Sequence, residues 1–119
     1  MVQRQKEKPK RIAVCNLHDR VCPRFDQTRE IFIYDINQSD KRPIEKLDVS
    51  NFSPERIMPL LAERKVGVII SGGIQERFQV MLLRSNVDVI WGIAGNVKDV
   101  VQAYLRGRLR CGMGILERP

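Results

Sequence analysis

The sequence lacks several features that would place it in a broad class at once. No apolar run approaches the roughly 20 residues that a membrane-spanning helix needs. The opening MVQRQKEKPKR has no apolar stretch of the kind found in a secretory signal. Cysteine occurs three times, an odd number, and histidine once. These observations argue against a disulfide framework and predict a protein of the reducing cytoplasm, whose thiols are free or bind metal.

Recognisable catalytic sets are missing as well. A nuclease that uses two metal ions needs clustered carboxylates, and Asp35 has no acidic partner on the first apolar run. The glycine pair at 72–73 lacks the following Lys-Ser/Thr of a P-loop. A nucleophilic pair of Cys22 and His18, oriented by Asp19, has no further support. We therefore do not expect an enzyme, and a small thiol-dependent enzyme is the weakest alternative.

The net charge of +7 is unevenly distributed along the chain. Residues 12–105 contain 12 Lys+Arg and 12 Asp+Glu, so the positive excess lies before and after them. Basic tails of this kind are typically solubilising, and some bind an anionic partner. We expect flexible tails at 1–10 and 110–119. An interaction or regulatory module whose tails bind nucleic acid or an acidic protein is the alternative function.

Hydrophobic patterns predict a single α/β domain over residues 11–109. Short apolar runs indicate buried strands, and a 3.6-residue periodicity indicates helices. The order β-β-β-α-β-α-β-α predicts a mixed five-stranded sheet with helices on both faces. Strands 11–15, 66–71 and 87–91 should form its parallel centre. The remaining expected strands are 30–36 and 44–48, and the expected helices follow Ser53, Gly73 and Asn96.

Capping residues set the expected helix ends. Ser53 and Asn96 are typical N-cap residues, and Gly107 stands where a helix usually stops. Pro59 leaves two arrangements open, because a proline inside a helix removes a backbone hydrogen bond. Either residues 54–57 form a separate turn and the helix starts at Pro59, or one helix bends there.

Three loops should meet at one edge of the sheet, where ligands bind in open α/β folds. They are 16–28, 71–74 and 92–96. The last two are rich in glycine and lead into helix N-termini, whose N–H groups and dipole attract anions. A plain strand-to-helix turn is the structural alternative for each. The edge therefore predicts a site for a small anion.

Four segments carry a resemblance to a known family. They are RIAVCN at 11–16, VCPRFDQTREIFIYDI at 21–36, VGVIISGGIQERF at 66–78 and NVKDVVQAYLRGRL at 96–109. With these segments the chain resembles the dinitrogenase iron–molybdenum cofactor biosynthesis family, the nitrogenase accessory factor-like domains. The resemblance implies a ribonuclease H-like fold that binds or carries metal–sulfur cofactors or their precursors.

The chain departs from this family at one place. Many members have His-Phe-Gly where this chain has Arg24, Phe25 and Asp26, and that histidine is a candidate cofactor ligand in the family. Arginine stays protonated and does not ligate a metal in this way, but it can hydrogen-bond an anionic cluster. His18 is a candidate substitute.

We therefore expect a non-enzymatic carrier for an anionic iron–sulfur or molybdenum–sulfur cluster, which the purified protein need not retain. The expected partners are the cluster or its precursor and a protein that donates or accepts it, with no nucleic acid or membrane. Cys15, Trp91 and Tyr104 are expected in the core, and for Cys22 a core role and a functional role both stay open. The candidate cofactor-binding residues are Arg20, Cys22, Arg24, Phe25, Ser71, Gly72, Gly73, Ile74, Gly95 and Asn96, and the candidate metal ligands are His18 and Cys22.

Overall fold

Six strands form one mixed sheet in the part of the chain that the computed structural model describes, residues 9–38 and 42–112. The strand order is β4-β3-β1-β5-β6, and a two-residue strand, β2, stands outside this order and pairs with the C-terminal end of β1. The strands are β1 Arg11–Leu17, β2 Arg20–Val21, β3 Glu30–Asp35, β4 Glu45–Asp48, β5 Val68–Ile70 and β6 Asp88–Ile90.

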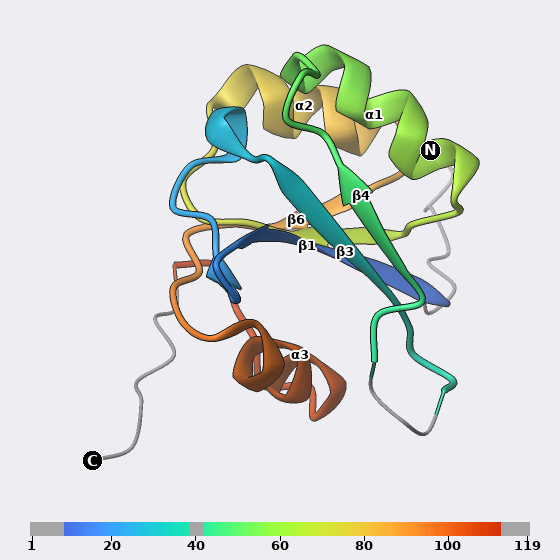
Figure 1. The fold of residues 1–119 in the computed structure, drawn as a ribbon, viewed down its shortest axis with the longest axis vertical. Coiled ribbons are helices and arrows are strands. Elements are labelled where there is room, and N and C mark those ends of the chain that lie inside the picture. Colours follow the sequence, from blue (N-terminus) through green and yellow to red (C-terminus); the bar gives the residue numbers. More distant parts are fainter. Residues whose placement is uncertain (1–8, 39–41, 113–119) are drawn as a thin grey trace, which may run out of the picture.

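The helices lie on both faces of this sheet, as the alternating order predicts. Helices α1 (Pro54–Glu63) and α2 (Glu76–Arg84) cover one face, and α3 (Val97–Leu105) covers the other (Figure 1). A short 3-10 helix, η1 (Phe25–Gln27), lies between β2 and β3. Each face of the sheet thus has its own apolar layer to bury.

The parallel centre of the sheet is confirmed. Strand β1 pairs in parallel with β5, with Val14 opposite Ile70, and β5 pairs in parallel with β6. Strands β3 and β4 are antiparallel additions on the other side of β1. The predicted count of five strands was one too low, because His18 (φ 51°) and Asp19 (φ 65°) form a left-handed turn that folds the chain back onto β1 as β2.

Strand β1 is buried on both faces, as its continuous apolar sequence predicts. Ala13 and Cys15 belong to the cluster under α1 and α2, and Ile12 and Val14 belong to the cluster under α3. The expectation that Trp91 lies in the core was wrong. Its side chain is 41% exposed, because it directly follows β6, an edge strand of the sheet.

Helix α1 continues through Pro59, so a helix beginning only at Pro59 is excluded. Ser53 occupies the N-cap position with an extended backbone, but its side chain makes no capping hydrogen bond. Asn96 caps α3 in the expected way, since its side chain accepts the Lys98 N–H at 2.9 Å. At the other end of α3, Gly107 has a φ of +70° and ends the helix as predicted.

Parts of both predicted tails lie against the body. The Lys10 carbonyl accepts the Ile36 N–H at 3.0 Å. The Gly112 N–H donates to the Trp91 carbonyl at 2.7 Å, and the Cys111 thiol lies 3.7 Å from the Val89 carbonyl. Residues 1–8 and 113–119 of these tails lie outside the described residues. Within the described ranges, no helix combines the length and apolarity needed to cross a membrane.

Candidate functional site

The three loops expected at the C-terminal edge of the parallel strands form one hydrogen-bonded assembly. The chain segment around β2, which belongs to the first loop, is hydrogen-bonded to both of the other loops, 71–74 and 92–96. On one side the Val21 N–H donates to the Gly95 carbonyl, and the Val97 N–H at the start of α3 donates to the Asp19 carbonyl, both at 2.9 Å. On the other side the Phe25 N–H donates to the Gly73 carbonyl at 2.8 Å. The predicted meeting of the loops is therefore observed.

The Gly72 and Gly73 N–H groups are engaged within this assembly. Gly72 donates to the Cys22 carbonyl at 3.1 Å, and Gly73 donates to the Pro23 carbonyl at 2.6 Å. A Cβ at Gly72 would lie 2.5 Å from the Cys22 carbonyl oxygen, which explains why glycine is needed there. These two N–H groups hold the loop after β2 in place and are not presented to a ligand in this conformation.

A pocket of about 800 Å³ opens beside the β1–β2 hairpin. It is bounded by the end of β1, the loop after β2, the start of β3 and the segment between β4 and α1. Its lining residues are Asn16, Leu17, His18, Cys22, Pro23, Asp26, Gln27, Thr28, Arg29, Glu30, Ser50 and Phe52.

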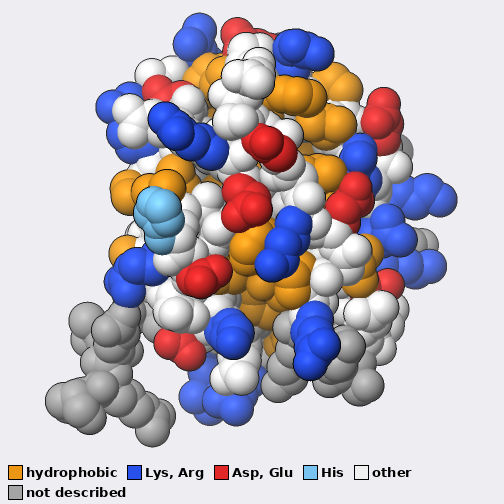
Figure 2. Space-filling model, viewed as in Figure 1, with side chains coloured by type: hydrophobic (Ala, Val, Ile, Leu, Met, Phe, Trp, Pro, Cys, Tyr) orange, Lys and Arg blue, Asp and Glu red, His pale blue; other side chains and the backbone are white. Residues whose placement is uncertain are grey.

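Both candidate metal ligands, His18 and Cys22, line this pocket. His18 is exposed, and Figure 2 shows the single histidine at the flank of the molecule. The Cys22 residue is only 2% exposed, and its thiol donates to the Arg24 carbonyl oxygen at 3.2 Å. In the described part of the chain, no group of three or more His, Cys, Asp or Glu side chains could hold a metal ion. The pocket can therefore offer a soft ligand or two, and it provides no closed metal site.

The other predicted site residues do not line the pocket. The Arg24 guanidinium is exposed and forms an ion pair at 3.0 Å with Asp26, which does line it. Arg20 lies opposite Asn96 in an isolated bridge on the α3 side. The two glycine-rich loops are hydrogen-bonded to the chain segment around β2, and Ser71 in the first of them is fully buried. Ile74 packs against the core. Arg20 and the two glycine-rich loops therefore do not line the pocket, whereas Arg24 is joined to its wall through Asp26.

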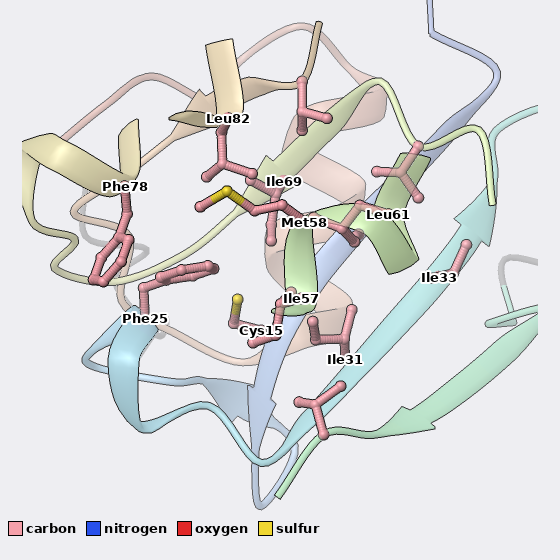
Figure 3. Packing of buried hydrophobic residues seen from close by; sticks show 14 of the residues in the cluster. Cys15, Phe25, Ile31, Ile33, Ile57, Met58, Leu61, Ile69, Phe78 and Leu82 are labelled. Atoms are coloured by element: carbon pink, nitrogen blue, oxygen red, sulfur yellow. The ribbon is translucent and has the colours of Figure 1, made fainter. Parts of the chain in front are cut away.

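Phe25 is a core residue. It is fully buried, and its ring centroid is 5.8 Å from that of Phe78 on α2 (Figure 3). It leaves no surface for a ligand in this conformation. Its burial anchors η1 to the core and so sets the position of the neighbouring loop that carries Cys22 and Arg24.

Cys15 is buried in the same cluster, with its sulfur directed into the core between Phe25 and Ile57 (Figure 3). Burial raises the pKa of the Cys15 thiol to about 12, because the thiolate would lose its solvation. The Thr28 and Ser71 hydroxyls lie beside this thiol and oppose the rise in its pKa. Neither hydroxyl oxygen makes a hydrogen bond of regular geometry among the described residues.

The sequence alone did not point to the polar side chains of the pocket. Asn16 is 4% exposed; its amide nitrogen donates to Glu30 at 2.8 Å, and its Oδ1 has no partner among the described residues. Thr28 is 6% exposed, and its hydroxyl oxygen also has no hydrogen-bond partner of regular geometry among the described residues. An Asn directly after a buried apolar strand was the only available signal. Its pairing with Glu30 depends on the β1–β3 register.

The fold and this edge site define a small α/β domain with a ligand-sized pocket beside a hairpin. The chain belongs to the dinitrogenase iron–molybdenum cofactor family, whose sequence model matches residues 8–107. No curated protein matches the chain.

Solved structures share the fold. The crystal structure of PH0822 has a TM-score of 0.74 and 23% sequence identity, covering 85% of this chain and 95% of that one. The apo form of the orange protein from Desulfovibrio gigas has a TM-score of 0.72 and 21% identity, covering 89% of this chain and 95% of that one. At such identities the likeness concerns the fold.

Proposed function

We propose that this protein is a non-enzymatic carrier for an anionic iron–sulfur or molybdenum–sulfur cluster, or for a precursor of one, in the cytoplasm. The observation that carries the proposal is the pocket beside the β1–β2 hairpin, whose lining includes both Cys22 and His18. Membership of the cofactor family supports it. The strand order β4-β3-β1-β5-β6, with β3 antiparallel to β1, supports a ribonuclease H-like fold as its scaffold.

Cys22 is the proposed direct ligand. A thiolate sulfur is a soft donor that suits iron, copper and molybdenum–sulfur centres. Its present hydrogen bond to the Arg24 carbonyl is local, so a small shift of the loop frees the sulfur for the cargo. His18 stands at the turn of the same hairpin and offers a nitrogen donor from the pocket wall.

Arg24 is the proposed countercharge. Its guanidinium is 57% exposed and is held at the rim of the pocket by Asp26. An exposed pair of this kind contributes little to stability, so a polyanionic cargo can compete for the arginine. On the face drawn in Figure 2, basic and acidic side chains are interspersed, which supports a local countercharge over a broad basic surface.

Metal retention tests this proposal. Protein purified without oxygen is incubated with thiomolybdate, or with iron and sulfide, then desalted and analysed for metal and sulfide. Wild type and Cys111→Ser should retain metal, because Cys111 lies at the edge of β6 and not in the pocket. Cys22→Ser should bind at least about tenfold more weakly. Absence of retained metal in wild type, or equal retention in all three, would refute the proposal.

Charge and coordination can be separated with Arg24. Arg24→Lys keeps the positive charge and should retain most of the cargo, and Arg24→Gln should release it at lower salt than wild type. Equal salt sensitivity of wild type and Arg24→Gln would exclude the arginine as countercharge.

A further inference from the structure

Two free cysteines face each other across the β1–β2 hairpin. The register pairs Asn16 with Val21, so Cys15 and Cys22 are the next opposed residues, and the Cys22 N–H donates to the Cys15 carbonyl at 2.8 Å. Directly opposed residues have Cα atoms about 4.5–5.5 Å apart and side chains on one face. Both side chains accordingly belong to the cluster under α1 and α2. A disulfide needs a Cα separation of about 4.4–6.8 Å, a range that includes the usual spacing of opposed residues. Burial is the main cause of the raised pKa of the Cys15 thiol, and the Cys22 thiol is close enough to Cys15 to contribute to it.

The two thiols have unequal access to solvent. Cys22 lines the 800 Å³ pocket, and Cys15 is fully enclosed by the core. A small reagent therefore reaches Cys22 first. The Thr28 and Ser71 hydroxyls, which have no partners of regular geometry among the described residues, lie beside the Cys15 thiol. A hydroxyl can donate to a thiolate, so these groups partly offset the burial that disfavours a negative charge on Cys15.

We propose that Cys15 and Cys22 form a reversible disulfide when the protein meets a low-molecular-weight disulfide. The Cys22 thiolate attacks one sulfur of the reagent, so that a mixed disulfide forms and one reagent thiolate leaves. The Cys15 thiolate then attacks the Cys22 sulfur, which breaks the mixed disulfide and releases the second reagent thiolate. The two protein thiols are oxidised, the reagent is reduced to two thiols, and the cysteine protons pass to the departing thiolates.

The disulfide would withdraw the Cys22 sulfur from the pocket. This consequence rests on the proposed function, in which Cys22 binds the cargo. The oxidised protein should then release or refuse the cluster, and a reductant should restore binding. The hairpin itself needs little change, because the opposed backbone positions are already joined by a hydrogen bond.

Thiol counting tests the disulfide independently of any metal. The full chain carrying Cys111→Ser is incubated with glutathione disulfide under native conditions, and free thiols are then titrated after denaturation. The two remaining thiols should both disappear, with no glutathione attached by mass spectrometry. Adding Cys15→Ala should leave one glutathione on Cys22, and adding Cys22→Ser should leave Cys15 free. Persistence of both thiols, or glutathione on both cysteines, would overturn the proposal.

Two controls keep these outcomes interpretable. Circular dichroism reports whether each variant is folded. If Cys15→Ala is unfolded, Cys15→Val takes its place, because the valine side chain fills the cavity that alanine leaves. Metal retention is compared before and after oxidation of the Cys111→Ser chain. A disulfide that forms without changing metal retention overturns the regulatory consequence. Absence of metal in the reduced protein is instead a failure of the proposed function, and the thiol count still decides the disulfide.

Discussion

Replacement of Gly72 by alanine should loosen the hairpin more than the same change one residue later. A Cβ at Gly72 would lie 2.5 Å from the Cys22 carbonyl oxygen and 2.6 Å from the Pro23 carbonyl carbon. Both are backbone atoms, so the loop after β2 has to move. A Cβ at Gly73 would lie 3.4 Å from the Pro23 carbonyl oxygen, and neither glycine has a positive φ. The two variants therefore differ in steric clash alone.

The magnitude follows from the contacts that must shift. Overpacking in a closely packed region costs about 1–3 kcal/mol, and each weakened hydrogen bond costs about 1 kcal/mol. The N–H groups of both glycines bond to the displaced loop. Alanine returns about 0.4–1 kcal/mol by restricting the unfolded chain. We expect Gly72→Ala to lower the free energy of unfolding by about 2–3 kcal/mol, and Gly73→Ala to stay within about 1 kcal/mol of wild type.

Urea unfolding followed by circular dichroism measures both values, and native-state hydrogen exchange localises the effect. The Val21 and Phe25 amides, which bond to the two glycine loops, should exchange faster in Gly72→Ala than in Gly73→Ala. Equal stability of the two variants, or a loss below about 0.5 kcal/mol for Gly72→Ala, would refute the steric argument.

Two further predictions concern a cap and a buried thiol. Asn96→Ala should lower the free energy of unfolding by about 1 kcal/mol. Ser53→Ala should have a smaller effect, because of these two residues only Asn96 makes a side-chain capping bond. Equal losses of stability in chemical denaturation would contradict this prediction. Stability should fall as pH rises from about 9 towards 12, because the unfolded chain releases the Cys15 proton near the ordinary value of 9.0 and the folded protein keeps it to about 12. The stability that Cys15 contributes is fully present below pH 9, and above it the free energy of unfolding should fall by at most about 1.4 kcal/mol per pH unit. Cys15→Val, unfolded across the same pH range, should lack this fall.

The opening hairpin illustrates how a local pattern misleads. CNLHDRVC places two cysteines and the only histidine close together, and its pattern predicts a strand that ends at Cys15 and a loop over 16–28. The sequence did not reveal that His18 and Asp19 adopt left-handed conformations, which are uncommon for residues other than glycine. That turn creates β2 and sets Cys22 opposite Cys15. It also directs Arg20 towards Asn96, away from the pocket.

The polar residues of the pocket illustrate a second limit of prediction from the sequence. Asn16 and Glu30 are opposite each other only because β1 and β3 pair in one register. Thr28 reaches the neighbourhood of Cys15 because Phe25 is buried against Phe78 and thereby fixes η1. Such contacts join residues that no local periodicity relates. Likewise, Trp91 is a large apolar residue expected in the core, but it is exposed because β6 is at the edge of the sheet.

Local sequence was enough to predict the alternating strands and helices, the parallel centre, the cap at Asn96 and the stop at Gly107. Those features depend on the apolar period and on local backbone preference, which a short window of residues carries. It also indicated that three loops share one edge, since parallel strands end together. Which N–H donors of that edge are already used depends on the whole fold, because Gly72 and Gly73 bond to a loop some 50 residues earlier in the chain. The position of Cys22 beside both a pocket and a second thiol likewise depends on the fold, because pairing register and burial are properties of the folded chain.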